Sequence, residues 1–300
     1  MRSMYDVLIV GGGPAGLSAA MLLGRCMRKV ALFDSGVYRN SYSHAMNGFI
    51  SRDGTPPAEF LRLGREDLAK YEVDLKQKRV VRVTKEGELF KVEDEDNQVY
   101  LSRKMLLATG LCDRWPKIPG AEPFYGSSIH HCPYCDGYES KNKPLAAYGK
   151  NRDAIGLSLS LKTWSSDVML FTDGTSRLTR EDRELLARNK VQINTAAIER
   201  LEGEDGHLQR IVLKNGQVEN REAMFFATGS DQHSDLARQL QCDFTSKGVV
   251  RTYKHQQTNV PGLYVAGDAA RDMQLVIVAA AEGTKAAVAI NMELQKEFRL

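Results

Sequence analysis

The chain alternates short apolar runs with polar, glycine-rich turns, and this pattern predicts an α/β fold. The first apolar run, Val7–Val10, leads directly into Gly11-Gly-Gly-Pro-Ala-Gly16 and a segment with helical periodicity, and a second apolar run follows at Val30–Phe33. A strand, a tight turn, a helix and a further strand form a βαβ unit, whose parallel strands are buried on both faces.

The same pattern recurs in the second half, where Gly149 stands 138 residues after Gly11. The apolar segment 144–148 precedes this second turn, and Val168–Phe171 follows it. The two halves also share an Ala-Thr-Gly strand end, at 105–110 and 224–229, each after an alternating, hairpin-like segment. Two copies of one plan are therefore predicted, the alternative being a chance match between unrelated α/β segments.

The order of these segments predicts that the second copy is inserted into the first. The breaker-rich segment Asp113–Gly120 follows the first Ala-Thr-Gly, and Gly262–Asp268 supplies a late strand before an alanine-rich helix. We expect two Rossmann-like, three-layer ββα nucleotide-binding domains, joined by two crossings that act as hinges. Their predicted limits are 1–114 with 246–300 for the first domain and 115–245 for the inserted one.

Composition narrows the class of protein without changing this picture. A length of 300 residues suits two domains, and 42% hydrophobic with 26% charged residues is typical of a soluble globular chain. The net charge of +3 favours neither a nucleic-acid nor a membrane-surface partner. No signal peptide or membrane-spanning stretch is visible, so a cytoplasmic protein is expected.

The first glycine turn predicts a nucleotide site. In Gly11-x-Gly13-x-x-Gly16 the glycines allow a tight turn and close approach of a pyrophosphate to the helix N-terminus. Asp34 ends the next strand, where a carboxylate accepts hydrogen bonds from ribose hydroxyls. Gly267-Asp268 stands before the last helix, and such a pair commonly holds the ribityl-phosphate part of FAD in two-domain flavoproteins, so FAD is favoured over NAD here. The alternatives are a glycine turn without ligand and an Asp268 that only caps a helix.

The richest segment for chemistry is His130-His-Cys-Pro-Tyr-Cys135-Asp136. The five cysteines (Cys26, Cys112, Cys132, Cys135 and Cys242) form no disulfide framework, but Cys132 and Cys135 have redox spacing. A helix turn and nearby imidazoles lower a thiol pKa, and such a pair cycles between dithiol and disulfide. Asp136 can shuttle the proton, and His131 can act as a base or stabilise the Cys132 thiolate.

Three other interpretations of this segment stay open. His130 or His131 could join the two cysteines in a zinc site, although adjacent ligands crowd and no second Cys-x-x-Cys exists. The cysteine pair could be buried and inert. The histidines could be surface residues beside a true redox pair. We expect no metal.

With these motifs the chain resembles the low-molecular-weight thioredoxin reductases and related flavin-dependent disulfide oxidoreductases. The resemblance rests on Gly11–Gly16, Ala108-Thr-Gly110, Cys132-x-x-Cys135-Asp136-Gly137, Ala227-Thr-Gly229 and Gly267-Asp268, in family order over nearly the whole chain. It implies an FAD domain, an inserted pyridine-nucleotide-like domain and a homodimer. It also implies that Cys135 faces the flavin as a charge-transfer thiolate, that Cys132 exchanges with substrate and that Asp136 donates the proton.

The chain departs from the family pattern in its second nucleotide site. Asn151 stands where a glycine normally admits the pyrophosphate, and Asp173 follows the next strand where NADPH-dependent relatives carry a basic cluster. Only Arg177 and Arg180 lie nearby. Near the flavin, Gln274-Leu275-Val276 replaces the family's Arg-Gln-Ala. The predicted cofactor contacts are Gly11, Gly13, Pro14, Ala15, Gly16, Asp34, Arg39, Asn40, His44, Asn47, Thr109, Gly110, Gly267, Asp268, Gln274 and Leu275.

The sequence thus predicts an FAD-dependent dithiol–disulfide oxidoreductase in which NAD(P)H is not the ordinary donor. Ferredoxin, oxygen or a second flavin in the inserted domain would be the electron partner, as in three divergent branches: ferredoxin-linked thioredoxin reductases, dithiol oxidases of natural-product pathways and diflavin oxidoreductases. The substrate would be a thioredoxin-like protein or a small dithiol or disulfide. The alternatives are an NAD(P)H-dependent thioredoxin reductase, a small-molecule dithiol oxidase and a flavin-bound redox sensor without turnover.

Overall fold

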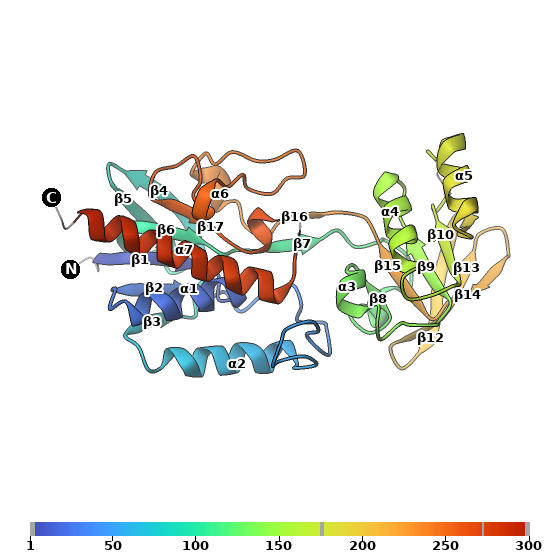
Figure 1. The fold of residues 1–300 in the computed structure, drawn as a ribbon, viewed down its shortest axis with the longest axis horizontal. Coiled ribbons are helices and arrows are strands. Elements are labelled where there is room, and N and C mark those ends of the chain that lie inside the picture. Colours follow the sequence, from blue (N-terminus) through green and yellow to red (C-terminus); the bar gives the residue numbers. More distant parts are fainter. Residues whose placement is uncertain (1–3, 175–176, 272, 298–300) are drawn as a thin grey trace. The chain divides into compact units, whose positions relative to one another are not determined.

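The computed structural model describes residues 4–174, 177–271 and 273–297, and the chain divides into two units. Unit 1 comprises Met1–Ser41, Phe49–Cys112 and Asp231–Leu300, and unit 2 comprises Tyr42–Gly48 and Asp113–Ser230 (Figure 1). The strands β7 (Leu111–Asp113) and β16 (Ser230–Gln232), in which the chain passes between units, pair with each other. The described residues contain no helix that is both long and apolar enough to cross a membrane.

Unit 1 is built on one twisted sheet with the order β3-β2-β1-β6-β5-β4, to which β17 adds by pairing with β6. Strands β3, β2, β1, β6 and β17 are parallel, and β4, β5 and β6 form an antiparallel meander. The elements of this sheet and its helices are β1 (Met4–Val10), α1 (Pro14–Arg25), β2 (Val30–Phe33), α2 (Pro57–Leu68), β3 (Val73–Lys76), β4 (Val80–Glu86), β5 (Leu89–Asp94), β6 (Val99–Leu107), α6 (Leu236–Gln239), β17 (Leu263–Val265) and α7 (Val276–Glu297).

Side chains of β1 alternate between two cores, as the two-residue period of a strand requires. Val7 and Ile9 pack with the buried faces of α1, α2 and α7. Leu8 and Val10 pack with the meander and with α6 on the other face. Because both faces are covered, the buried part of the strand, Val7–Val10, is continuously apolar, and the unit has three layers.

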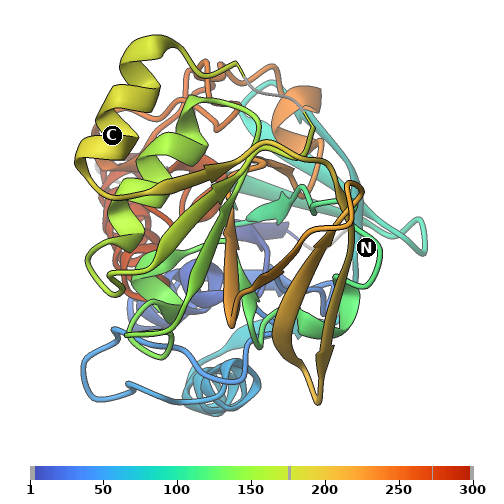
Figure 2. The same ribbon diagram turned by 90° about the vertical axis from the view of Figure 1, so that its right-hand side faces the viewer.

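Unit 2 repeats this plan with a parallel sheet of order β11-β10-β9-β15-β8 and a separate antiparallel meander β12-β13-β14. Figure 2 shows α4 and α5 on one side of the parallel strands and the meander on the other. Ala146 of β9 packs toward the meander, whereas Leu145 and Ala147 pack toward the helices. The elements are β8 (Ile129–His130), α3 (Pro133–Asp136), β9 (Leu145–Tyr148), α4 (Arg152–Leu161), β10 (Val168–Phe171), α5 (Arg180–Arg188), β11 (Gln192–Asn194), β12 (Ile198–Glu204), β13 (His207–Leu213), β14 (Val218–Asn220) and β15 (Ala223–Phe226).

The predicted fold class is confirmed: two Rossmann-like α/β domains, the second inserted into the first. The unit limits differ from the predicted domain limits: residues 42–48 and 113–114 lie in unit 2, and residues 231–245 lie in unit 1. This segment contains α6, whose Leu236 and Ala237 join the core beneath the meander. The side chain of Gln239 also accepts a hydrogen bond from the Val83 backbone N–H at 2.9 Å.

Helices α1 and α7 of unit 1 pack closely because glycines remove the side chains between their backbones. A Cβ atom added at Gly283 of α7 would lie 2.0 Å from the carbonyl oxygen of Ala15 in α1. Near the start of α1, a Cβ at Gly16 would lie 1.8 Å from the carbonyl oxygen of Gly11. These contacts hold the N-terminus of α1 against the sheet and against α7.

We expect Gly283→Ala to lower the free energy of unfolding by about 1–3 kcal/mol, because the backbone of Ala15 must move to admit the added methyl group. Gly156→Ala is the matched control: it also lies inside a helix, α4, and its added Cβ meets nothing within 4 Å. That substitution should raise stability by about 0.5–1 kcal/mol, since alanine favours helix. Thermal unfolding followed by circular dichroism measures both, and equal stability of Gly283→Ala and wild type would contradict the packing argument.

Candidate functional site

The turn between β1 and α1 leaves an open place for a ligand at the helix N-terminus. Gly11 has φ +114°, and a Cβ there would lie 2.1 Å from the carbonyl oxygen of Ala108, so only glycine fits. Gly13 is the N-cap of α1, no side chain caps this helix, and a Cβ at Gly13 would meet nothing within 4 Å. The first-turn N–H groups therefore have space in front of them, which suits the pyrophosphate of a dinucleotide.

Asp34 lies against this turn at the end of β2. A Cβ at Gly12 would come within 2.2 Å of the Asp34 carboxylate. The carboxylate accepts hydrogen bonds from Gly36 N–H at 3.0 Å, from Tyr38 Oη at 2.5 Å and from Arg65 at 3.0 Å. Burial and the Asp34 charge raise the pKa of Tyr38 above its ordinary value, so its hydroxyl stays a donor. The carboxylate is thus fixed beside the glycine turn, and its contact with a ribose stays a prediction.

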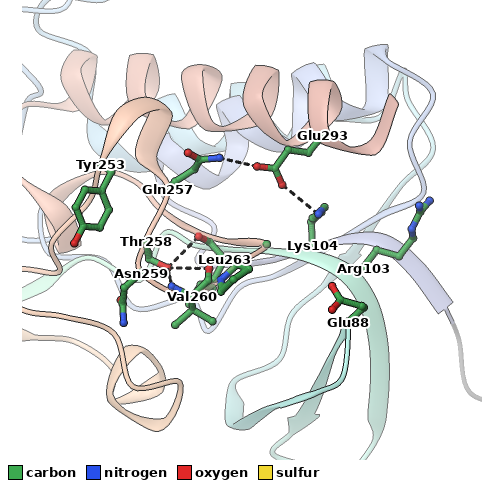
Figure 3. A pocket seen from close by; sticks show the side chains of 12 residues that line it. Glu88, Arg103, Lys104, Tyr253, Gln257, Thr258, Asn259, Val260, Leu263 and Glu293 are labelled. Atoms are coloured by element: carbon green, nitrogen blue, oxygen red, sulfur yellow. Dashed lines mark hydrogen bonds and ion pairs between the residues drawn. The ribbon is translucent and has the colours of Figure 1, made fainter. Parts of the chain in front are cut away.

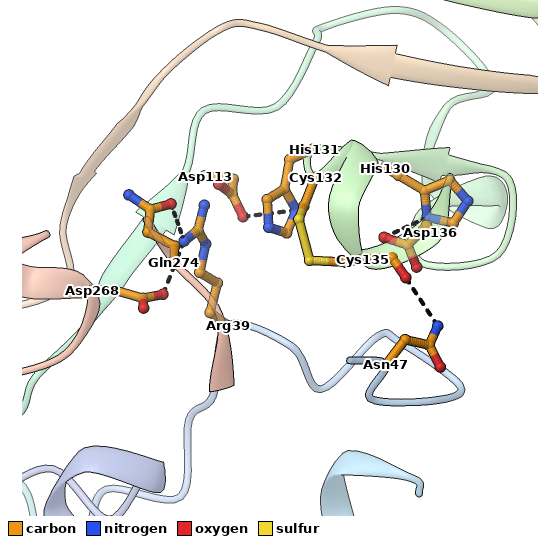
Figure 4. The surroundings of a disulfide bond; sticks show 10 residues. All are labelled: Arg39, Asn47, Asp113, His130, His131, Cys132, Cys135, Asp136, Asp268 and Gln274. Atoms are coloured by element: carbon orange, nitrogen blue, oxygen red, sulfur yellow. Dashed lines mark hydrogen bonds and ion pairs between the residues drawn. A yellow bond between two sulfur atoms is a disulfide. The ribbon is translucent and has the colours of Figure 1, made fainter. Parts of the chain in front are cut away.

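The late Gly267-Asp268 pair forms a second part of the candidate cofactor site in unit 1. Gly267 has φ +76°, and its N–H donates to the buried carboxylate of Glu282 at 3.1 Å. Arg39 forms an ion pair with Asp268 at 2.9 Å and donates to Gln274 Oε1 at 2.5 Å (Figure 4). Three residues predicted as flavin contacts therefore come together from distant parts of the sequence.

The other predicted cofactor residues are placed as follows. Pro14 and Ala15 form the first turn of α1, and Thr109 with Gly110 follows β6. Asn40 is half-buried in the loop after β2, and the carbonyl of Leu275 accepts the N–H of Ala279 in the first turn of α7.

The structure places His44 and Asn47 in unit 2, with the cysteine pair rather than with Arg39. His44 Nε2 lies 2.9 Å from Ser127 Oγ, and Asn47 Nδ2 donates to the carbonyl oxygen of Cys135 at 2.9 Å (Figure 4). Their contact with a flavin stays a prediction. Their position beside the cysteines had no signal in the sequence, because the segment Tyr42–Gly48 is separated from its partners by more than 80 residues.

Cys132 and Cys135 form a disulfide at the carboxyl end of the unit 2 sheet. The S–S distance is 2.13 Å and the Cα atoms are 5.3 Å apart. Cys132 is the extended N-cap of α3, and its carbonyl accepts the N–H groups of Cys135 and Asp136 at 3.2 Å. Pro133, with its fixed φ, begins the turn that brings the two sulfurs together. Among the described residues no group of three or more His, Cys, Asp or Glu is placed to hold a metal ion.

Two pairs of an acid and a histidine flank the disulfide. His130 Nδ1 lies 3.5 Å from Asp136 Oδ2, and both side chains are largely buried, with exposed fractions of 8% and 18%. His131 Nδ1 lies 3.5 Å from Asp113 Oδ2, which also accepts the Tyr125 hydroxyl at 3.1 Å. His131 adjoins Cys132 in sequence, and its role as a base remains a prediction.

Burial sets the protonation of the first pair. Burial, with the negative charge of Glu139, raises the pKa of Asp136 to about 7. Burial, with the neighbouring His131, lowers the pKa of His130 to about 4. Asp136 is therefore mostly a protonated carboxylic acid below pH 7 and can donate a proton to a thiolate beside it.

The second glycine turn keeps the backbone plan of the first but not its chemistry. Asn151 is the N-cap of α4, as Gly13 is of α1, but its side chain donates to the carboxylate of Asp153 at 2.9 Å. A carboxylate in the first turn of α4 repels a pyrophosphate. The first turn of α4 therefore carries a carboxylate, which the first turn of α1 lacks.

Asp173, which follows β10, places a carboxylate at the rim of this second turn. It accepts the Ile198 N–H at 2.8 Å and the Tyr148 hydroxyl at 3.1 Å, and it pairs with Lys150 at 3.0 Å. Although burial opposes the effect, the Ile198 N–H and Lys150 lower the pKa of Asp173, so it stays charged. Arg180 is exposed and pairs with Glu184 of its own helix. This rim does not fit the 2′-phosphate of NADPH.

A cavity of about 380 Å³ lies elsewhere in unit 1, beside β6 and the C-terminal half of α7 (Figure 3). Two charged side chains of its lining, Glu293 and Lys104, form an ion pair at 3.1 Å. Glu293 also accepts a hydrogen bond from the Gln257 side chain at 2.6 Å. None of the predicted site residues is among the described residues that line it.

Comparison with known proteins shows similarity over both units. A family model described as pyridine nucleotide-disulphide oxidoreductase matches residues 5–283. A "Probable thioredoxin reductase" of Arthroderma benhamiae is 31% identical, over 98% of this chain and 81% of its own. A putative thioredoxin reductase TrxB from Bacillus anthracis has a TM-score of 0.92 and 34% identity, covering 98% and 99% of the two chains. The structure of HlmI has a TM-score of 0.94 and 35% identity, covering 98% and 93%.

We expect Asp136→Asn to slow reduction of the disulfide by excess dithiothreitol by about 10²-fold or more at pH 6, because the leaving thiolate loses its proton donor. The wild-type rate, divided by the dithiothreitol thiolate concentration, should fall as pH rises through about 7, where Asp136 ionises. This inflection should vanish in Asp136→Asn. In Glu139→Gln it should move to lower pH, because the charge that raises the Asp136 pKa is gone. A wild-type profile that stays flat from pH 5 to 9 would refute the assignment.

Proposed function

Because the chain belongs to the pyridine nucleotide-disulphide oxidoreductase family, we propose that it is an FAD-dependent dithiol–disulfide oxidoreductase that acts through Cys132 and Cys135 without NADPH as its ordinary donor. That it is an oxidoreductase acting on sulfur groups follows from the family. The observation that carries the finer proposal is the contrast between the two glycine turns: the first has open space at Gly13, and in the second the Asn151 side chain is bonded to the Asp153 carboxylate.

The family is FAD-dependent, and the residues of unit 1 fit that group. The open turn at Gly13 would take the pyrophosphate, Asp34 the ribose, and the Arg39–Asp268–Gln274 cluster the part nearer the flavin. When bound, FAD supplies two-electron exchange with a dithiol or disulfide.

The cysteine pair supplies the exchange with substrate. In its reduced form, the Cys132 thiolate attacks a substrate disulfide, one substrate sulfur leaves and takes a proton from Asp136, and a mixed disulfide forms. The Cys135 thiolate then attacks Cys132 Sγ, which restores the internal disulfide and releases the second substrate sulfur. The same steps in reverse oxidise a substrate dithiol, so the geometry serves both directions. Asn47, bonded to the Cys135 carbonyl, helps to fix the turn.

The electron partner we propose is ferredoxin, a second flavin or oxygen. NADPH is disfavoured as the donor because two carboxylates stand at its expected site. Asp153 lies in the first turn of α4, and Asp173 lies at the rim where a 2′-phosphate would lie. We further propose a cytoplasmic homodimer whose substrate is a thioredoxin-like protein or a small dithiol or disulfide.

The second candidate function is that of an NAD(P)H-dependent thioredoxin reductase. The names of the relatives from Arthroderma benhamiae and Bacillus anthracis favour it. It requires that a nicotinamide dinucleotide be held by residues other than the family's glycine turn and basic cluster. A small-molecule dithiol oxidase and a sensor without turnover remain alternatives, and the two measurements below separate all of these.

We expect NADPH not to reduce the bound flavin rapidly or saturably in anaerobic stopped-flow mixing. Dithiothreitol should reduce the same flavin through the cysteine pair, which controls for a competent flavin. Mixing with NADH tests the effect of the Asp173 carboxylate separately, since NADH lacks the 2′-phosphate that this carboxylate would repel. Rapid, saturable reduction by NADPH would overturn the first proposal in favour of the second candidate.

We expect Cys132→Ser to lower oxygen consumption with small dithiols, or turnover of a thioredoxin, to background, because no mixed disulfide can form. Cys26→Ser is the matched control, because Cys26 is a half-buried free cysteine at the end of α1 and should not affect turnover. Retention of every dithiol activity by Cys132→Ser would reject the redox assignment.

A further inference from the structure

His130 is a buried imidazole that the exchange steps above do not use. It ends strand β8, its side chain is 8% exposed, and its ring lies beside that of Phe225 with centroids 5.2 Å apart. Figure 4 shows its ring directed at Asp136, whose Oδ2 is 3.5 Å from His130 Nδ1. It is thus the histidine beside Asp136, whereas His131 lies against Asp113.

Burial, assisted by the surrounding charges, keeps both groups of the pair neutral near pH 6. Burial lowers the pKa of His130 to about 4, and coulombic effects of His131, Lys143 and His44 act in the same direction. Burial and Glu139 raise the pKa of Asp136 to about 7. The proton of the pair therefore belongs to the carboxyl group, not to the imidazole.

A neutral imidazole has one N–H donor and one nitrogen acceptor. A hydrogen bond with the Ser127 backbone acts to raise the pKa of His130, which is the direction expected when the ring N–H is the donor. We propose that His130 is a positioning residue for Asp136, and that its Nδ1 accepts the carboxyl proton so that the two side chains share one proton beside the disulfide. The inference rests on the proposed function only for the use of that proton.

This sharing has a consequence for each exchange. When Asp136 gives its proton to a leaving thiolate, a buried carboxylate remains next to Nδ1, and the negative charge raises the proton affinity of His130. A proton from water can then bind to the imidazole and return to Asp136, which restores the acid. The balance is one proton from solvent for each thiolate protonated, with no change in the oxidation state of either side chain.

The first test leaves His130 unsubstituted and needs no electron donor. In protein labelled with ¹⁵N in its histidines, the His130 nitrogens at pH 6 should show the neutral tautomer with the proton on Nε2. They should also show an inflection near pH 7, where Asp136 ionises. Asp136→Asn should abolish that inflection, and His131→Asn should keep it. An imidazolium, an Nδ1–H tautomer or an inflection that persists in Asp136→Asn would overturn the proposal.

The second test measures the effect on chemistry without flavin turnover. Protein reduced with dithiothreitol and freed of it is oxidised by excess of a small disulfide, and the rate is followed from pH 5 to 9. His130→Phe keeps a ring against Phe225 and should slow the reaction about tenfold at pH 7 with an altered pH profile. The exposed His207→Asn should leave rate and profile unchanged. An unchanged profile in His130→Phe would reject the positioning role, whereas failure of the proposed function would appear only in turnover with an electron partner.

Discussion

The architecture depends on backbones that approach each other more closely than side chains allow. At the first turn, the backbone of Gly11 lies against Ala108 of the neighbouring strand end, and that of Gly16 lies against Gly11 itself. Gly283 brings α7 to the backbone of Ala15 in the same way. These contacts fix one helix N-terminus at the carboxyl edge of a parallel sheet, which is where open α/β folds place ligands.

The second unit keeps this architecture with different side chains at its glycine turn. Its sheet, helices and meander repeat those of the first unit, and Asn151 occupies the same helix-capping position as Gly13. The fold is set by apolar strands that alternate along the chain with the helices that cover them, and both copies contain these elements. Nucleotide binding is set by a few side chains at the turn, and in the second copy these include Asn151 and the carboxylates of Asp153 and Asp173. In unit 2 the disulfide lies at a different turn, the one that follows β8.

Local pattern was enough to predict the fold class and the motifs that lie on single turns. The glycine turn, Asp34 and the cysteine pair are each defined by neighbours within a few residues. The partners of these motifs were not predictable, because they come from distant segments. Glu282, which holds the Gly267 turn, looks in sequence like one charged residue on a helix, and Arg65, which holds Asp34, looks like a surface arginine. Arg39, Asp268 and Gln274 are each predicted as flavin contacts. The bonds of Arg39 to the other two join segments more than 200 residues apart, which the sequence does not indicate.

The neutral pair of Asp136 and His130 also bears on the acid tolerance of the fold. A carboxyl whose pKa rises from 3.8 to about 7 on folding makes stability fall as pH rises through that interval. An imidazole whose pKa falls from 6.5 to about 4 makes stability fall as pH drops through its own interval. Between about pH 4 and 6.5 the two effects oppose each other, because the unfolded chain carries the proton on the imidazole and the folded chain carries it on the carboxyl. Folding then moves a proton from one side chain to the other without taking up or releasing one. The protein thereby holds a buried acid next to its disulfide while its stability stays nearly independent of pH across that range, as far as these two groups determine it.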